Sequence, residues 1–292
     1  MLNRHRAILS LLLESGGEAD HRPVTKWAFI LRHESTTGGG PAFYQFLPYK
    51  YGPFSFCLFQ EMAALARDGF VTEKDHRWTL TDAGRKAANT TQPDVRRDIR
   101  RIVQSHTKST RKETDDHLID YVYKKYPWYT VNSEIRQLAS RRRGEVAVYT
   151  AGYEGLLVDG FLNGLMDAGI VRLIDVRNNP VSRRYGFHKT TLRRLCSNVG
   201  IEYAHFPQLG ITSDERQDLD RPGVRQSLFA EYARTTLEDE GDAIDEVARL
   251  VKDAPSVLVC MESCPSECHR FHLAKPVSTR TRLPIRHLEL RA

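Results

Sequence analysis

Residues 257–270, with the sequence VLVCMESCPSECHR, gather three cysteines, two glutamates, a histidine and an arginine directly after an apolar run. A carboxylate such as Glu262 can act as a nucleophile or general base, whereas thiols and imidazoles are zinc ligands. A zinc site would use Cys260, Cys264, Cys268 and His269. Structural zinc sites more often use well-separated pairs of closely spaced ligands, so we predict no metal and no other cofactor here.

A reactive thiol is another alternative for this segment. Cys264 and Arg270 have the Cys-x5-Arg spacing of a phosphatase-like loop, but Cys264 does not directly follow the apolar run. Cys268 stands beside His269 near a predicted helix start, a setting that favours the thiolate. Each cysteine taken singly is more often a small buried residue, so the segment favours chemistry at Glu262 rather than at sulfur.

Polar residues also end two earlier apolar runs, VAVYTAGY at 146–153 and VRLIDVR at 171–177. Both runs are rich in residues typical of strands, and a helical pattern separates them. The residues at their ends are Tyr149, Gly152, Tyr153, Asp175 and Arg177. Because the carboxyl ends of parallel strands meet at one edge of a sheet, we expect these residues to lie near Glu262.

Such an edge predicts acid–base chemistry beside a bound phosphate. Two carboxylates suit glycosidic bond cleavage, and arginines together with a helix start suit phosphate. The predicted catalytic residues are Glu262, Asp175 and His269. The predicted ligand- or phosphate-binding residues are Tyr149, Gly152, Tyr153, Arg177, Ser182, Arg183, Cys260, Cys268 and Arg270. The structural alternative is that the two carboxylates only pair with the nearby arginines Arg177, Arg183 and Arg270.

The wider pattern divides the chain into three parts. Residues 146–292 alternate strands and helices, which predicts an α/β domain with an open, mostly parallel sheet. Residues 1–90 contain helices followed by two short β-prone runs around a polar turn, the order of a winged helix-turn-helix module. Residues 91–145 are predicted to be a basic, mostly helical connector.

The charge pattern favours a polyanionic partner. The 292-residue chain has a net charge of +6, and residues 96–112 carry seven basic side chains against one acidic side chain. The predicted DNA-binding residues are Arg96, Arg97, Arg100, Arg101, Arg141, Arg142 and Arg143. We therefore expect nucleic acid, DNA rather than RNA, as a partner, with a homodimer as a further option. The lack of an apolar run of about 18 residues excludes a spanning helix, and an odd count of five cysteines suits the cytoplasm.

The motifs YTAGYEG, LIDVRNNPVSRRYGF, VGIEYAHFPQLG and C-x-E-x5-CHR resemble, in this order, the family called domain of unknown function 488. The resemblance spans about residues 146–280 and implies one α/β domain without implying a reaction. The resemblance implies that the positions shared by the family are Tyr149, Gly152, Asp175, Arg177, Pro180, Ser182, Cys260, Glu262, Cys268, His269 and Arg270. Tyr153 stands where the family tends to have histidine, and Cys264 is an additional cysteine.

The segments FLPYKYGPFS and YVYKKYPWYTVNS resemble the antitoxin-like winged-helix domain of the SocA and Panacea type, over about the first 135 residues. That resemblance implies either DNA binding or docking of a protein. The leading functional prediction is a protein that acts on or recognises a nucleotide or base, through glycosidic or base-modifying chemistry on DNA. The alternatives are a non-enzymatic sensor, regulator or phage-defence component that reads modified or damaged DNA, and a protein-binding adaptor.

Overall fold

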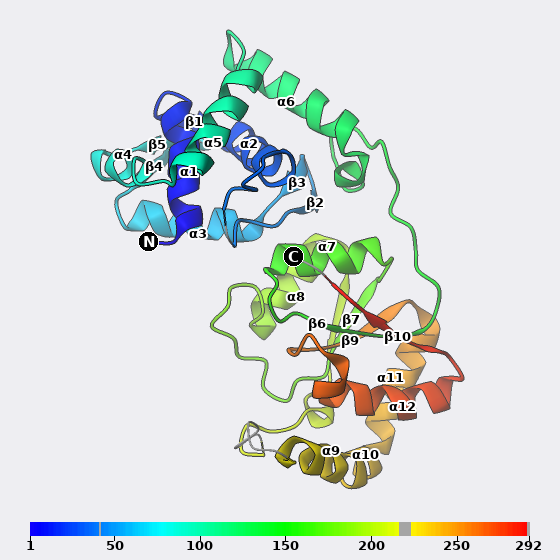
Figure 1. Ribbon diagram of the computed structural model, residues 1–292. Helices are drawn as coiled ribbons and strands as arrows, with labels where there is room; N and C mark the ends of the chain where they lie inside the picture. The colour runs from blue at the N-terminus through cyan, green and yellow to red at the C-terminus, as the bar shows by residue number, and fades with distance from the viewer. Residues whose placement is uncertain (41, 216–222, 291–292) are drawn as a thin grey trace. The chain divides into compact units, whose positions relative to one another are not determined.

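The computed structural model describes residues 1–40, 42–215 and 223–290, and the chain forms two compact units, Met1–Ser140 and Arg141–Ala292 (Figure 1). Within the described residues, no helix combines the length and the apolar character that crossing a bilayer requires. The basic segment predicted as a connector provides helices of the first unit up to Ser140.

Helices form most of the N-terminal unit. They are α1 (Asn3–Glu14), α2 (His21–Glu34), α3 (Phe56–Arg67), α4 (Asp82–Ala88), α5 (Pro93–His106) and α6 (Arg111–Lys125), followed by the 3-10 turn η1 (Pro127–Thr130). Local capping explains two of the helix starts. Ser55 Oγ accepts a hydrogen bond from Leu58 N at 3.2 Å, and Thr110 and Glu113 form a reciprocal capping box at the start of α6. Helices α5 and α6 pack against α1 and α2, so they are part of this core.

Two small antiparallel sheets complete the N-terminal unit. Strands β1 (Glu18–Asp20), β5 (Arg77–Leu80) and β4 (Val71–Lys74) pair in that order, and β2 (Leu47–Tyr49) pairs with β3 (Gly52–Phe54). The β4–β5 hairpin occupies the two β-prone runs, and Trp78 in β5 is buried at 1% exposure. A winged-helix identity for this unit stays a prediction.

A five-stranded sheet organises the C-terminal unit, and all of its strand pairs are parallel. The strands are β6 (Val148–Gly152), β7 (Arg172–Asp175), β8 (Glu202–His205), β9 (Ser256–Cys260) and β10 (Ile285–Leu288), in the spatial order β10-β6-β9-β7-β8. The predicted α/β class with a parallel sheet is therefore confirmed for this half. Strand β10 lies in the basic C-terminal segment, where the sequence predicted no strand.

Helices cover both faces of this sheet (Figure 1). Helices α7 (Val158–Asp167) and α8 (Lys189–Asn198) lie on one face, and α11 (Gly241–Asp253) and α12 (His269–Thr281) lie on the other. The unit also contains α9 (Val224–Arg234) and the short turns α10 (Thr236–Asp239), η2 (Pro207–Leu209) and η3 (Pro265–Glu267). Strand residues Val148, Ile174 and Leu258 pack with α11 and α12 in one buried apolar cluster. This core fixes the carboxyl ends of β6, β9 and β7 side by side.

Candidate active site at the carboxyl edge of the sheet

The loop that links β9 to α12 is tied to the end of β6. The backbone N–H groups of Tyr153 and Glu154 both donate to Met261 O, at 3.1 and 2.9 Å. The loop backbone passes so close to Gly152 that a Cβ atom there would lie 1.8 Å from Glu262 O. Only glycine fits this position, and the predicted ligand role of Gly152 becomes a steric one: it lets the loop approach the sheet.

Asp175 and Arg177 form the centre of a buried group that we call the ion-pair cluster, with Tyr153 and Tyr203. Asp175 Oδ1 accepts from Arg177 N and Nε at 3.2 and 2.8 Å, and its Oδ2 accepts from Arg177 Nη2 and from the Tyr203 hydroxyl, both at 2.6 Å. Arg177 Nη1 donates to the Tyr153 hydroxyl at 2.8 Å and to Phe187 O at 2.9 Å. All four lone-pair positions of the carboxylate are thus occupied by donors of the chain itself.

The electrostatics of the ion-pair cluster fix its protonation. Burial opposes the charge on Arg177, but the hydrogen bonds and charge of Asp175 prevail and raise its pKa above the ordinary value. Burial also raises the pKa of Tyr203, and the Asp175 carboxylate raises it further. Arg177 therefore stays charged and Tyr203 stays neutral across the physiological range.

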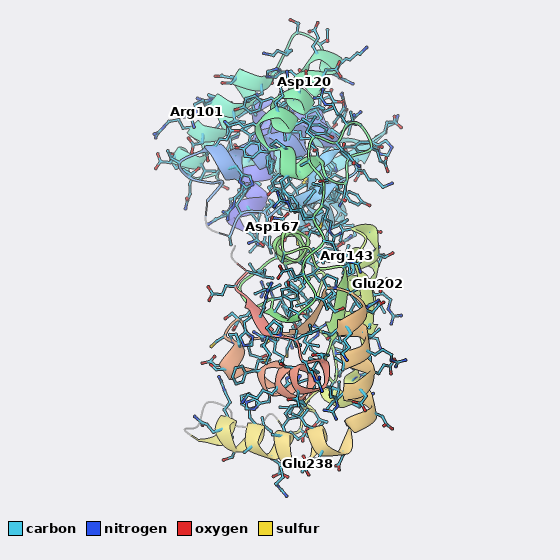
Figure 2. All side chains as sticks on the ribbon, turned by 90° about the vertical axis from the view of Figure 1, so that its right-hand side faces the viewer. Arg101, Asp120, Arg143, Asp167, Glu202 and Glu238 are labelled. Atoms are coloured by element: carbon cyan, nitrogen blue, oxygen red, sulfur yellow. The ribbon has the colours of Figure 1, made fainter. Side chains whose placement is uncertain are left out.

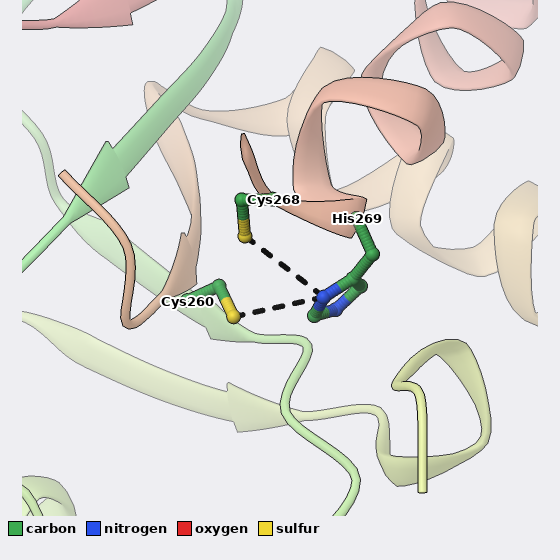
Figure 3. A group of neighbouring side chains, drawn as sticks. All are labelled: Cys260, Cys268 and His269. Atoms are coloured by element: carbon green, nitrogen blue, oxygen red, sulfur yellow. Dashed lines mark hydrogen bonds between the residues drawn. The ribbon is translucent and has the colours of Figure 1, made fainter. Parts of the chain in front are cut away.

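Cys260, Cys268 and His269 form a second group, the thiol–imidazole cluster (Figure 3). Cys260 ends β9 and Cys268 precedes α12, whose first residue is His269. The two sulfurs lie 3.6 and 3.9 Å from His269 Nδ1, and the three side chains are buried to 1 or 2% exposure. His269 Nε2 donates to Val176 O at 3.0 Å, which holds the ring with Nδ1 toward the sulfurs.

Glu262 borders the thiol–imidazole cluster from the loop. Its Oε2 lies 3.2 Å from Cys260 Sγ, which donates to the carboxylate. Burial raises the pKa of Glu262, and the neighbouring Cys260 adds to that shift. A small cavity of about 40 Å³ is lined by Glu262, Cys268 and His269 together with apolar side chains such as Phe229 and the charged pair Arg225 and Glu267. Within residues 1–40, 42–215 and 223–290, Glu262 has no cationic partner.

Three other predicted ligand residues, Tyr149, Ser182 and Arg183, lie outside the two clusters. The Tyr149 hydroxyl donates to Glu145 O at 3.1 Å, near the beginning of β6 and away from the carboxyl edge. Ser182 Oγ accepts from Arg184 N at 3.1 Å, and Arg183 is exposed in the same loop. Cys264 is exposed and contacts Ser266, so it lies outside the group of metal-ligand atoms.

Neither predicted phosphate-binding arginine of the edge is placed to hold a phosphate in this structure. The donors of Arg177 are taken up within the ion-pair cluster. Arg270 is 1% exposed, and its Nη1 and Nη2 donate to Glu262 O at 2.6 Å and Ser263 O at 3.2 Å. Both guanidiniums therefore hold backbone and side-chain acceptors of this edge in place.

The sequence interpretation missed Tyr203 and two backbone acceptors, Val176 O and Phe187 O. Tyr203 lies on β8, next to β7 in the sheet, and its hydroxyl reaches Asp175. The run EYAHFP at 202–207 has the alternating pattern of a short strand, and this pattern is the signal that would place Tyr203 on the same sheet. The backbone acceptors have no signature in the sequence, because any residue type supplies a carbonyl.

The predicted DNA-binding arginines divide into paired and exposed side chains. On α5, Arg96 and Arg100 both pair with Glu14, Arg97 pairs with Asp94, and Arg101 pairs with Asp98. Figure 2 shows Arg101 at the outer surface of the N-terminal unit.

The three arginines that lead into the C-terminal unit also differ from one another. Arg141 is half-buried and donates to Val199 O and Ile170 O, so it holds the chain against that unit. Burial lowers the pKa of Arg141. Arg142 and Arg143 are exposed, which leaves them the more accessible of the three.

A larger cavity of about 630 Å³ lies in the N-terminal unit, a volume typical of ligand sites. Its apolar wall includes Tyr49, Tyr51 and Phe59. Lys26 lines it with a buried amine that donates to Tyr51 O at 2.5 Å and Pro53 O at 3.2 Å, and burial lowers the pKa of Lys26 to about 7. Asp115 also lines this cavity, and burial raises the pKa of its carboxyl group.

A family model described as "Domain of unknown function DUF488" matches residues 157–277. The matched range contains Asp175, Arg177 and all three residues of the thiol–imidazole cluster. Strand β6 precedes the matched range. The match supports the resemblance predicted for the C-terminal half, and its description assigns no activity. No curated protein and no solved structure matches the chain. The resemblance of the N-terminal half to SocA or Panacea domains stays a prediction.

Proposed function

We propose that this protein associates with nucleic acid and that its C-terminal unit acts on a nucleotide or base, with Glu262 as the catalytic carboxylate. The observation that carries the proposal is the contrast between the two acidic residues of the edge. Every lone pair of Asp175 is occupied by an N–H or O–H donor, whereas Glu262 has the thiols of Cys260 and Cys268 beside its carboxylate and borders a cavity. Glu262 has no cationic partner among the described residues, and it follows the carboxyl end of a central parallel strand, the place where α/β domains carry reactive groups.

The remaining predicted catalytic residues take positioning roles in this proposal. His269 is 2% exposed, so it acts through the sulfurs that its Nδ1 faces. Asp175 and Arg177 flank Val176, whose carbonyl orients His269. The ion-pair cluster therefore helps to fix the orientation of the His269 ring through the Val176 carbonyl. Glu262, which lines the cavity, is the group that would contact a substrate.

The nucleic-acid part of the proposal depends on charge. The net charge of +6 favours a polyanion, and Arg142 and Arg143 are exposed beside the C-terminal unit's first strand. The pairs on α5 do not prevent phosphate contact, because exposed ion pairs contribute only about 0–1 kcal/mol and can exchange partners. DNA is the preferred nucleic acid, with base removal or base modification as the reaction class.

The test compares the full-length protein with Glu262→Gln on single-stranded and duplex DNA oligonucleotides that contain normal, modified or damaged bases. Base loss is read by alkaline strand cleavage, and base modification by mass spectrometry of the released nucleosides. We expect Glu262→Gln to lower the rate about 100-fold or more, the usual contribution of an acid–base group. Glu267→Gln is the matched control, because Glu267 lines the same cavity but pairs with Arg225 at 3.2 Å. Equal rates for Glu262→Gln and the unaltered protein would overturn the proposal.

A second candidate function, a ligand- or protein-binding adaptor, is favoured by the cavity around Lys26 in the N-terminal unit. An aromatic wall with a few polar groups is the usual composition of a binding pocket. DNA binding measured by fluorescence anisotropy separates the candidates. Phosphate contacts strengthen steeply as salt is lowered, so DNA binding that is absent even at low salt favours the adaptor.

A further inference from the structure

The thiol–imidazole cluster has the donor atoms of a transition-metal site already gathered in one place. Cys260 Sγ, Cys268 Sγ and His269 Nδ1 all lie within 4.8 Å of one another (Figure 3). Two thiolates and an imidazole are soft and borderline ligands, a set that suits zinc better than magnesium or calcium. The three donors come from a strand end and a helix start in the sheet core, so their spacing is held by the fold rather than by a flexible loop.

The orientation of His269 fits metal ligation. A carbonyl oxygen can only accept a hydrogen bond, so the contact of His269 Nε2 with Val176 O places the ring proton on Nε2. The lone pair of Nδ1 then points between the two sulfurs. Histidines that bind metals usually donate their other N–H to a carbonyl or carboxylate in this way, which fixes the tautomer and the ring plane.

The distances fit a tetrahedral zinc ion. Zinc bonds of about 2.3 Å to sulfur and about 2.0–2.1 Å to nitrogen place the two kinds of ligand atom roughly 3.6 Å apart. The observed separations from His269 Nδ1 are 3.6 Å for Cys260 and 3.9 Å for Cys268. The two sulfur–nitrogen separations therefore lie within a few tenths of an ångström of the values expected around a zinc ion.

The competing explanation is that the two thiols only form weak hydrogen bonds in a buried core. One ring lone pair accepts from only one of two thiols in a good geometry, and Cys260 also contacts the Glu262 carboxylate. Arg270 adds a second observation. It is 1% exposed, its Nε has no hydrogen-bond partner, and among the described residues no carboxylate pairs with it. Arg270 interacts electrostatically with Cys268, so a positive charge lies beside one of the two sulfurs.

We propose that Cys260, Cys268 and His269 bind one zinc ion and leave its fourth position to a water molecule in the cavity beside Glu262. Three protein ligands with an open position are the pattern of catalytic zinc, whereas structural zinc is bound by four. The cavity of about 40 Å³ is large enough for a water molecule. Glu262 stands outside the ligand set, where its carboxylate accepts a hydrogen bond from that water.

The proposed site narrows the reaction class. Zinc-dependent base deaminases combine two cysteines and a histidine on zinc with a glutamate that is not a ligand. This chain has the same set of side chains: Cys268, His269 and Glu262 line one cavity, and Cys260 lies beside them, two positions before Glu262. The reaction class would then be hydrolytic deamination of a base, in which a water molecule adds to the ring carbon, the bond to the exocyclic amino group breaks and ammonia leaves. That step depends on the function proposed above, whereas the binding of zinc does not.

The experiment measures the metal content of tag-free, full-length protein by inductively coupled plasma mass spectrometry, after zinc loading and dialysis. We expect about one zinc per chain, with an apparent Kd of about nanomolar or tighter in competition with a chromophoric chelator. Cys268→Ser and Cys260→Ser should lose the zinc. The matched control is Cys264→Ser, an exposed cysteine in the same loop, which should keep it.

Two further measurements keep the proposal testable if a cysteine variant does not fold. Cobalt added to the unaltered protein should give the absorption of cobalt–thiolate bonds, and circular dichroism shows which variants are folded. Less than about 0.1 zinc per chain after loading, a different metal at full occupancy, or equal loss of zinc in Cys264→Ser would overturn the proposal. Zinc binding with a fully active Glu262→Gln would refute only the proposed function, whereas a zinc-free protein inactivated by that substitution would refute only the metal site.

Discussion

At the carboxyl edge of the C-terminal sheet, the ion-pair cluster and the thiol–imidazole cluster are both almost completely buried, but their donors and acceptors are matched differently. Asp175 uses four acceptor positions for four donors, and Arg177 uses four of its five N–H groups. The thiol–imidazole cluster brings two thiols to one imidazole lone pair and one carboxylate. The first cluster is held by strong N–H and O–H hydrogen bonds, whereas the second is held by weak contacts of thiols.

Charge at the end of a strand therefore does not by itself identify the reactive group. A buried ion pair is costly unless each charge is hydrogen-bonded, and Asp175 with Arg177 meets that condition entirely. Such a cluster stabilises the edge and orients Val176 O toward His269. The reactive candidates are the groups that meet through thiol contacts, which are weak hydrogen bonds, namely the two thiols, the imidazole and Glu262. Three predictions test this division of roles.

The largest expected effect is on the ion-pair cluster. Asp175→Asn leaves Arg177 buried without its counter-ion, and we expect a loss of about 3–5 kcal/mol in the free energy of unfolding of the C-terminal unit. Hydrogen exchange with peptide resolution, measured by mass spectrometry, checks this in the full chain. The peptides of β7 and β9 should lose protection, while those of Met1–Ser140 serve as the internal reference.

A double variant decides whether the lost stability belongs to the unpaired charge. Asp175→Leu with Arg177→Met removes both charges, and it should recover part of the loss, because apolar replacement of a whole buried pair is often tolerated. A loss below about 1 kcal/mol for Asp175→Asn would contradict the structural role of the cluster. With that result, Asp175 would again be a candidate for contact with a substrate.

The next largest effect concerns the loop that places Glu262. In Gly152→Ala the new Cβ meets Glu262 O at 1.8 Å and Glu262 C at 2.6 Å, and backbone atoms cannot rotate away. We expect a cost of about 1–3 kcal/mol in urea unfolding followed by circular dichroism, together with weaker zinc binding. Gly241→Ala is the matched control in the same unit, because the nearest atom to its Cβ is the flexible Arg280 Nη2 at 3.9 Å.

The Gly241→Ala control should change stability by no more than about 0.5 kcal/mol. If Gly152→Ala is equally mild and keeps full metal affinity, the loop does not depend on its close approach to β6. The thiol–imidazole cluster would then be positioned by α12 and β9 without help from the loop.

The sequence was sufficient to predict the parallel sheet and the edge that carries the polar residues. The runs at 146–153, 171–177 and 256–260 contain β6, β7 and β9. Short apolar runs rich in β-branched residues, placed between helical segments, are typical of buried strands. Strand β10 escaped prediction because its four residues, IRHL, are half polar and lie at the sheet's edge. Tyr149 was assigned to the carboxyl edge, yet β6 runs on to Gly152 and leaves its hydroxyl near the other end.

The sorting of the edge residues could not be predicted from the sequence. Asp175 and Glu262 are both carboxylates that follow or end a strand, so the sequence does not distinguish them. They differ in hydrogen bonding, because Tyr203 on β8 and the Arg177 guanidinium both donate to Asp175. The orientation of His269 depends on Val176 O, a main-chain atom without a sequence signature. Pairing across strands and backbone acceptors are properties of the folded chain, so sequence spacing does not contain them.

The smallest expected effect concerns the outer attachment of the loop. Glu154 Oε2 accepts from Ser263 N at 3.0 Å and from Ser263 Oγ at 3.1 Å, and these bonds lower the pKa of Glu154. A lowered carboxyl pKa stabilises the closed loop above the unfolded value of 4.5, and that contribution is lost as the pH falls through the lower folded value. Because Glu154 is exposed to solvent, we expect only a few tenths of a kcal/mol.

Glu154→Gln should therefore increase hydrogen exchange of the Ser263 amide by about twofold at pH 7, as measured by nuclear magnetic resonance. At pH 3.5 the protection of that amide should differ less between the two proteins, after correction for intrinsic exchange. A tenfold change at pH 7 would mean that the loop depends on this one carboxylate more than on Gly152 and Arg270. An unchanged rate would mean that those inner attachments hold it without Glu154, so that the site is positioned entirely from its buried side.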